Sequence, residues 1–221
     1  LSSDNWASYY DIARAITHAA DQGVRVINIS IGGSSSSSTL ENAVTYAWKK
    51  GSLVFACAHN YATSTPYYPA ACTYAVAVSA TTSSDTKASF SNFGTWIDLA
   101  APGTSILTTN RGGGYGSWNG TSFSSPMAAG LAALIWSADP SLTNGQVLDI
   151  MTQNADDLGT PGFDIYFGYG RINASASLAA VTGSPKVADT TEPSVSITSP
   201  ADGDALTGPV TIAVTCLLYT S

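Results

Sequence analysis

The sequence predicts an α/β fold: a mostly parallel sheet with helices on both faces, followed by a short piece of antiparallel β-structure. Near-continuous apolar, β-branched runs at 24–31 and 53–58 are typical of strands that are covered on both faces. A helical pattern at 38–50 lies between them and makes a βαβ unit, for which a right-handed crossover is expected. Towards the end of the chain the pattern of apolar residues changes, and they alternate with period two at 194–198 and 210–214.

The composition limits the classes of function. A chain of 221 residues can bury one sizeable core and begin a second domain. Charged residues make up 10% of the chain and the net charge is −7, so nucleic acid, whose binding needs clustered Lys and Arg, is not expected as a partner. No apolar run is long enough to span a bilayer. The chain starts at Leu1 without a signal-peptide pattern, so we expect it to be N-terminally incomplete.

The first elements follow from apolar periodicity. A helix is predicted over 5–22, where apolar residues recur at helical spacing before a glycine. The strand at 24–31 leads into a loop with a serine run. Ser38-Thr39-Leu40-Glu41 has the pattern of a capping box and opens a second helix, which ends at Lys49-Lys50-Gly51. A short strand at 53–58 follows.

The middle of the chain is rich in strands and turns. Strands are predicted at 74–80 and 95–100. The segments 106–109 and 115–118 flank the glycine-rich run 111–114 and predict a hairpin. This run is not a phosphate-binding loop, because no Gly-Lys-Ser/Thr follows it.

Three helices are predicted after the hairpin. The first spans about 122–137. Its apolar stripe is expected to contain Met127, Leu131, Leu134 and Ile135. A capping box at 143–146 opens a helix that runs to about 153. A short final helix is predicted at 174–180.

Ser122 is the first candidate functional residue. It lies at or beside the N-terminus of the helix at 122–137, where free backbone amides and the positive end of the helix dipole stabilise negative charge. A serine in this place is either the N-cap of the helix or a nucleophile.

The segment from Gly120 to Gly130 resembles the nucleophile segment of the subtilisin-like serine proteases (subtilases, peptidase family S8). It reads Gly-Thr-Ser-x-x-x-Pro-x-x-x-Gly, with Phe123-Ser124 in place of the family's Met-Ala and Met127-Ala128 in place of its His-Val. The resemblance covers about 5–181 and implies the C-terminal portion of a catalytic domain. It implies a serine endopeptidase that hydrolyses polypeptide substrates through an acyl-enzyme on Ser122.

The resemblance also implies an oxyanion site. Asn60 stands in a frame similar to the family's Ala-Ala-Gly-Asn, and its side-chain amide would donate to the oxyanion together with the Ser122 backbone amide. The alternative is a loop asparagine that bonds its own backbone. Ala58 and His59 would line the pocket for the substrate residue before the scissile bond. His59 stands where the family has glycine and would narrow or close that pocket.

Further substrate-binding residues follow from the same resemblance. Ser30-Ile31-Gly32 resembles the family's Ser-Leu-Gly segment, whose edge pairs with the substrate backbone in β fashion. The alternative is a strand end followed by a turn. Tyr9 and Ile12 match positions that line a distal apolar pocket, and core packing is the alternative for both.

A cation site is implied at a segment that precedes the strand 74–80. Carbonyls of Ala70, Cys72 and Ala75 with the Asp98 carboxylate would bind a structural Ca²⁺ or Na⁺, hard cations that take oxygen ligands. The alternative is that Asp98 caps the turn at 101–103. No cofactor is required for the chemistry.

Three cysteines are too few for a disulfide scaffold. Cys57 and Cys72 pair if the protein is secreted, or they are two small buried thiols. The third, Cys216, lies near the end of the chain.

No general base is found beside the nucleophile. The chain has two histidines. His18 lies in the first helix with no Asp arranged for it, and His59 belongs to the pocket. The family carries its base in a His-Gly-Thr-His segment and its carboxylate in an Asp-Thr/Ser-Gly segment, neither of which occurs in this sequence. We therefore expect both to lie upstream and the chain alone to be inactive.

Three other functions are considered. A non-catalytic subtilase relative would use the cleft to bind peptides, and His59 favours it. Alternatively, the C-terminal strands would form an adhesion or carbohydrate-binding module. An ester-cleaving α/β hydrolase is disfavoured, because Ser124 stands where the Gly-x-Ser-x-Gly elbow needs glycine. We expect a secreted monomer.

The domain organisation follows from these patterns. Residues 1–183 are expected to form the catalytic-domain portion and 184–193 a linker. Residues 194–215 resemble the opening strands of a bacterial Ig-like β-sandwich that is cut short. Residues 216–221 match one reading frame of a sequencing-library adapter (TGT CTC TTA TAC ACA TCT) and are expected not to be natural sequence.

Overall fold

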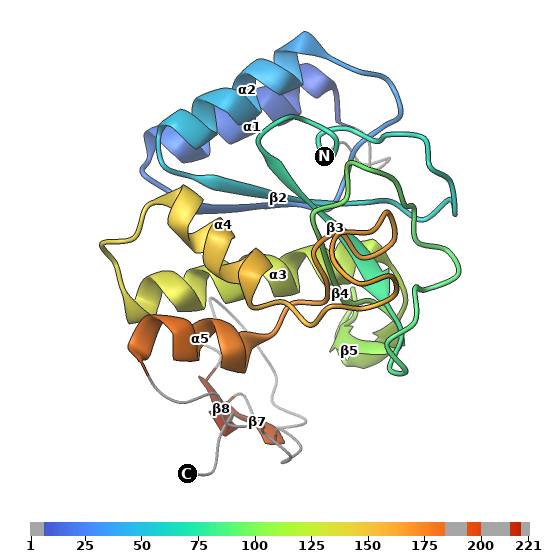
Figure 1. Ribbon diagram of the computed structural model, residues 1–221, viewed down its shortest axis with the longest axis vertical. Coiled ribbons are helices and arrows are strands. Elements are labelled where there is room, and N and C mark those ends of the chain that lie inside the picture. The colour runs from blue at the N-terminus through green and yellow to red at the C-terminus, as the bar shows by residue number, and fades with distance from the viewer. Residues whose placement is uncertain (1–6, 184–193, 200–212, 218–221) are drawn as a thin grey trace. The chain divides into compact units, whose positions relative to one another are not determined.

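The computed structural model describes residues 7–183, 194–199 and 213–217 (Figure 1). The chain forms two compact units, Leu1–Pro185 and Lys186–Ser221. The catalytic-domain portion predicted at 1–183 falls within the first unit, and the predicted linker at 184–193 lies outside the described residues.

The centre of the first unit is a four-stranded sheet with the order β1-β2-β3-β4. All three strand pairs are parallel, as predicted, and in their registers Val26 pairs with Leu53, Val54 with Ala75 and Val78 with Leu99. The strands are β1 (Val26–Ile29), β2 (Leu53–Cys57), β3 (Ala75–Thr81) and β4 (Leu99–Pro102). Every residue of β2 and β3 is buried, because helices cover both faces of the sheet.

The strand predicted at 95–100 begins later than expected. Ile97 donates its backbone N–H to the Gly94 carbonyl in a turn, and Asp98 then joins β3 through a bond from its backbone N–H to the Ala77 carbonyl. β4 therefore starts at Leu99, where regular pairing with Val78 begins.

Helices pack on both faces of the sheet, as predicted (Figure 1). One face carries α1 (Tyr9–Asp21) and α2 (Ser38–Lys49). The other carries α3 (Thr121–Ala138), α4 (Asn144–Gln153) and α5 (Ala174–Thr182). None of the helices among the described residues is long and apolar enough to cross a membrane.

Two capping boxes were predicted at helix starts, and the structure confirms one of them. The capping box of α4 is confirmed: Gln146 N–H donates to the Thr143 hydroxyl, and Thr143 N–H donates to the Gln146 side chain. The capping box of α2 is wrong by one residue, because the N-cap is Ser37. The Glu41 carboxylate accepts instead from the backbone N–H of Thr73, which ties α2 to the loop before β3.

The stripe predicted for α3 is partly wrong. Leu134 is 36% exposed, whereas Leu131 and Ile135 are buried. The helix contacts all four strands, and its buried face includes Ala128 and Ala132 beside Leu131 and Ile135.

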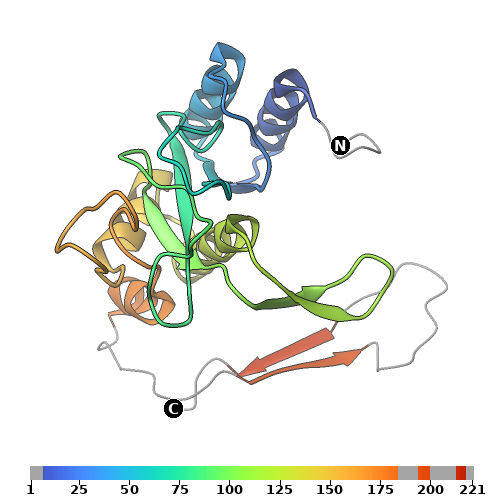
Figure 2. The ribbon, with the colours of Figure 1, turned by 90° about the vertical axis from the view of Figure 1, so that its right-hand side faces the viewer.

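A β-hairpin connects the sheet to α3. Its strands β5 (Ile106–Thr109) and β6 (Tyr115–Trp118) pair antiparallel with the predicted bounds. The turn contains Gly112, Gly113 and Gly114 with φ of 92°, 102° and 72°, values that L side chains rarely adopt. The hairpin projects away from the sheet (Figure 2).

The second unit contains one antiparallel pair, β7 (Ser194–Ser199) and β8 (Ala213–Leu217). The predicted strand at 194–198 is confirmed, whereas residues 210–212 lie outside the described residues, as do 218–221 of the suspected adapter sequence. Membership of an Ig-like sandwich and the adapter origin of 216–221 stay predictions.

Candidate active site

Ser122 is the second residue of α3 and is half-buried. The N-cap of α3 is Gly120, with φ 155° and no side-chain cap. The reading of Ser122 as an N-cap is therefore wrong. Because the first amides of a helix have no partner within the helix, the Ser122 N–H is oriented to donate to a ligand at this end.

The Asn60 side chain is fixed against the start of α3. Its Oδ1 accepts from both the backbone N–H and the hydroxyl of Thr121, each at 2.9 Å. Two donors on one atom identify that atom as the oxygen, so Nδ2 is left as a donor. This Nδ2 lies 3.4 Å from where a Cβ on Gly120 would sit, beside the turn that carries Ser122. The amide oxygen thus bonds the nucleophile turn rather than Asn60's own backbone.

A chain of polar contacts joins the end of β1 to α3. The Ser125 hydroxyl donates to Asn28 Oδ1 at 2.7 Å, and Asn28 Nδ2 donates to the Ser30 hydroxyl at 3.2 Å. The Ser30 hydroxyl donates to the carbonyl of Ser122 at 3.0 Å. Thr121, Asn28 and Ser125 were missed in the sequence, although polar side chains at alternate positions of an apolar strand gave a signal for Asn28.

The segment that follows Ser30 and Ile31 requires glycine at position 32, because there is no space for a side chain. A Cβ on Gly32 would lie 2.2 Å from the carbonyl oxygen of Tyr68 and 2.8 Å from His59 Nε2. Gly33 exchanges two backbone hydrogen bonds with Tyr68, at 3.0 and 2.8 Å. Ile31 is half-buried against α1. Residues 30–33 therefore form a strand end, and the two backbone hydrogen bonds with Tyr68 hold it on one side.

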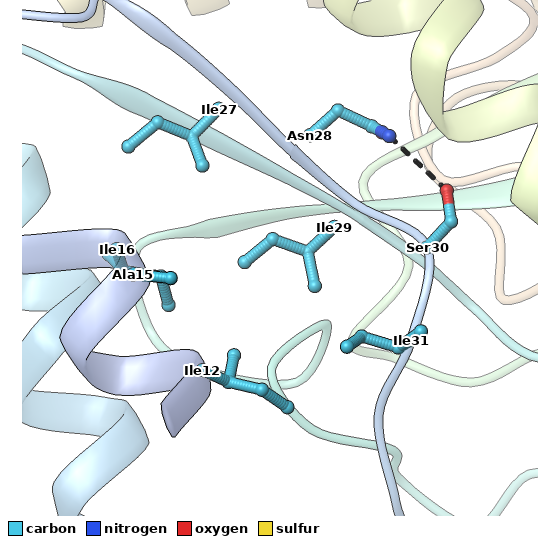
Figure 3. A pocket seen from close by; sticks show the side chains of 8 residues that line it. All are labelled: Ile12, Ala15, Ile16, Ile27, Asn28, Ile29, Ser30 and Ile31. Carbon is cyan, nitrogen blue, oxygen red and sulfur yellow. Dashed lines mark hydrogen bonds between the residues drawn. The ribbon is translucent and has the colours of Figure 1, made fainter. Parts of the chain in front are cut away.

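Tyr9 and Ile12, the two residues expected at a distal apolar pocket, lie on α1. Ile12 is 7% exposed and lines a pocket of about 300 Å³ between α1 and β1. Figure 3 shows side chains of α1 facing the alternate residues Ile27, Ile29 and Ile31, while Asn28 and Ser30 point to the other face. The Tyr9 hydroxyl reaches Gly33, and burial raises the pKa of Tyr9.

Ala58 and His59 differ in exposure. Ala58 has no exposed surface and packs among other small buried residues, including Ala70 and Ala77. His59 adopts φ 72° and packs its ring on Tyr67. Burial lowers the pKa of His59, so the imidazole is neutral at pH 7.

Asp98 bonds β3 rather than the turn at 101–103. Its Oδ2 accepts from the Ala77 N–H at 2.7 Å, so the reading as a cap of that turn is wrong. Burial raises its pKa to about 7.

The cation proposed at Asp98 would depend on backbone oxygens. No group of three or more His, Cys, Asp or Glu side chains within the described ranges could hold a metal. The Cys72 carbonyl also accepts from the Ala75 N–H at 3.0 Å. Carboxylate and carbonyl oxygens are the ligand types that a hard cation takes, so the cation at Asp98 stays a proposal.

Cys57 and Cys72 are free, buried thiols, as one of the two alternatives predicted. Burial raises the pKa of Cys57, and contacts with the side chains of Thr121 and Ser122 offset this only in part. Burial, with the Glu41 carboxylate nearby, raises the pKa of Cys72 to about 12. A neutral Cys57 thiol cannot take the proton of Ser122.

Neither histidine serves Ser122 as a base in this structure. His18 is exposed on α1, and the His59 ring contacts Tyr67 and Gly32. Among the described residues, the Ser122 hydroxyl has no hydrogen bond to an imidazole. The site combines a serine at a helix start with an asparagine amide fixed beside it.

A parallel α/β sheet with a serine at the start of a buried helix, facing a fixed asparagine amide, defines the class of serine hydrolases. The family model described as the subtilase family, Peptidase_S8, matches residues 2–170. The chain therefore belongs to the subtilase family.

Curated relatives and solved structures agree with this assignment. The chain is 48% identical over 164 residues to a thermophilic serine proteinase of Bacillus sp. (strain AK1), covering 74% of the chain and 40% of the relative. It is 41% identical over 174 residues to thermitase of Thermoactinomyces vulgaris, covering 79% and 61%. The chain thus spans about half the length of these relatives.

Among solved structures, the self-cleaved protease domain of PatA superposes with a TM-score of 0.75 at 30% identity, covering 83% of the chain and 72% of that domain. The fold and the family are those that the sequence predicts.

Proposed function

We propose that the protein is a subtilisin-type serine endopeptidase in which Ser122 is the nucleophile. The observation that carries this proposal is the Asn60 side chain, whose oxygen is held by Thr121 so that Nδ2 faces the Ser122 turn. Such a fixed donor has a use where negative charge develops on a substrate oxygen.

The proposed reaction is acyl transfer. A peptide lies along Ser30–Gly32, and its carbonyl oxygen enters between Asn60 Nδ2 and the Ser122 N–H. Attack by Ser122 Oγ forms a tetrahedral oxyanion, whose collapse expels the amine and leaves an acyl-enzyme that water hydrolyses. A histidine takes the Ser122 proton and returns it to the leaving amine, and an aspartate orients that histidine.

We propose that this histidine and aspartate lie in sequence upstream of the chain, so that the chain alone is inactive. β1 has a partner strand only on its β2 side among the described residues, and the pocket of Figure 3 lies beside its free edge. An apolar pocket beside an unpaired strand edge suits a further strand, and Ser30 connects this edge to Ser122.

A chimera tests the proposal. The part of thermitase outside its matched residues is joined to the chain, and hydrolysis of a chromogenic peptide is measured. We expect hydrolysis that Ser122→Ala abolishes, and no turnover by the chain alone. Equal hydrolysis by the Ser122→Ala chimera would exclude Ser122 as the nucleophile. Turnover by the chain alone that Ser122→Ala removes would contradict the inactivity.

A second function, a peptide-binding subtilase relative without catalysis, is favoured by His59, whose ring occupies the cleft beside Gly32. The same chimera distinguishes the two functions. Binding of peptide without hydrolysis, although the thermitase segment is present, would support the second function.

The remaining proposals are a secreted monomer and a structural Ca²⁺ or Na⁺ at Asp98. Calorimetric titration with Ca²⁺ tests the cation, and loss of the binding heat in Asp98→Asn would assign it to this carboxylate. Repeat sequencing of the locus decides whether 216–221 are natural, and light scattering gives the oligomeric state.

A further inference from the structure

Three aromatic side chains form a stack beside the proposed oxyanion site. The His59 imidazole packs on Tyr67 with 4.6 Å between ring centroids, and Tyr67 packs on Tyr61 with 5.3 Å. The rings of His59 and Tyr61 are nearly parallel, with an interplanar angle of 16°. Stacking at these distances is favourable beyond the burial of area. We call these three side chains the aromatic cluster.

The backbone of His59 directs the imidazole towards Gly32. Its φ of 72° lies in the left-handed region, which is uncommon for residues other than glycine and in which Asn, Asp and His are enriched. His59 Nε2 lies only 2.8 Å from where a Cβ on Gly32 would sit, so the edge of the ring lies beside Gly32. The ring also packs on Tyr67.

The His59 imidazole lies in space beside Gly32 that a substrate side chain would need. In the proposed reaction the scissile carbonyl oxygen binds Asn60 Nδ2, and the peptide runs back along Ser30–Gly32. The Cα of the residue before the scissile bond is one bond from that carbonyl, so it lies between Asn60 and Gly32. In this pose its side chain would point towards Gly32, where a Cβ would already lie only 2.8 Å from His59 Nε2.

We propose that the aromatic cluster restricts the residue before the scissile bond to glycine or alanine. The inference rests on the proposed function and names its substrate class: peptides with a small residue at this position. A larger side chain, such as that of Phe or Leu, would have to displace the imidazole from Gly32 and separate it from Tyr67.

Binding of product-like peptides to the chain tests this inference. The probes are Ac-Ala-Ala-Ala and Ac-Ala-Ala-Phe with free carboxylates, and the readout is the NMR shift of the Asn60 and Ser122 amides. We expect the wild-type chain to bind the alanine peptide at least about tenfold more tightly than the phenylalanine peptide. His59→Gly, which suits the φ of 72°, is expected to bring the two within about threefold.

Tyr67→Ala provides a second variant, since it removes the ring behind His59, and it is also expected to admit the phenylalanine peptide. His18→Ala, a change of the exposed histidine on α1, must leave the preference unchanged. Equal binding of both peptides by the wild-type chain would overturn the inference and leave the proposed function intact. Binding of neither peptide to any variant would overturn the proposed function and the inference with it.

Discussion

At the scale of single residues, Ser122 and Asn60 are held by partners that are distant in the sequence. Thr121 meets Asn60 because the end of β2 lies at the start of α3, and Ser125 meets Asn28 because β1 lies beside the same part of α3. A contact between residues that are 61 or 97 positions apart leaves no periodic trace in the sequence.

The Asn60 amide gives the first prediction. In the active chimera, Asn60→Ala is expected to lower kcat by about 10²–10³ with little change in KM, because the donor acts on the oxyanion and not on the ground state. In subtilisin, a member of this family, loss of such a donor costs about 3 kcal/mol. Asn42→Ala, on the exposed side of α2, is the matched control. An equal loss of kcat in both variants would contradict the assignment.

Asp98 gives a prediction for the pH dependence of stability. Its pKa is about 7 in the folded protein against an ordinary value of 3.8, because burial disfavours the charged form. The folded state binds this proton more tightly, so the stability present below pH 3.8 falls as the pH rises to about 7 and is then constant. The fall amounts to at most about 4 kcal/mol, since one pKa unit is about 1.4 kcal/mol.

Urea unfolding of the wild-type chain and Asp98→Asn between pH 4 and pH 8 measures this effect. We expect the free energy of unfolding of the wild type, relative to the variant, to decrease with pH. Asp149→Asn, an exposed change on α4, is the control. A wild-type stability that rises relative to Asp98→Asn over this range would show that a bound cation or another donor stabilises the carboxylate.

At the scale of elements, strand and helix types were predictable from periodicity, and the errors lie at the ends. β4 starts late because Asp98 and the turn before it are held by β3, and the start of α2 is shifted because Glu41 bonds Thr73. At α2 a tertiary hydrogen bond replaces the local one that the pattern indicated, and at β4 the turn bond from Ile97 to Gly94 takes the place of strand pairing. The buried face of α3 was misjudged at Leu134, because Ala128 and Ala132 lie against the sheet together with Leu131 and Ile135.

Arg171 ties the C-terminal loops to the sheet and gives a prediction at this scale. Its guanidinium pairs with Asp85 and, at 2.6 Å, with Asp156, and its backbone exchanges hydrogen bonds with Asp156. Arg171→Met is expected to lower the free energy of unfolding by about 1–2 kcal/mol, since the side chain is 30% exposed and solvent screens the pairs. Arg111→Met, at the exposed hairpin turn, is the control.

Urea unfolding at low and high salt separates this effect from a loss of packing. The difference between wild type and Arg171→Met is expected to shrink as salt screens the ion pairs. A difference that does not depend on salt would assign the loss to the aliphatic part of the side chain.

At the scale of the whole first unit, the sequence predicted the parallel sheet between two helix layers, and the structure confirms it. The resemblance implied a distal apolar pocket at Ile12, but not that such a pocket lies beside β1. Apolar periodicity indicates that a face is to be covered but not by which part of the protein. Only the arrangement of α1 against β1 exposes the gap between them.

This gap gives the last prediction. If the segment with the histidine and the aspartate packs beside β1, then Ile27→Lys should affect the isolated chain and the chimera differently. Ile27 is half-buried at the pocket, so in the isolated chain a lysine can keep its charge in water, and Tm should change by no more than about 4 °C. In the chimera the same lysine would be buried without a counter-ion, which is expected to lower both Tm and hydrolysis strongly. Thermal melts of both proteins measure this, with Tyr10→Lys on the exposed side of α1 as the control. An equal change of Tm by Ile27→Lys in the chimera and in the isolated chain would place the segment with the histidine and the aspartate elsewhere. The free edge of β1 would then be no more covered in the chimera than in the chain alone.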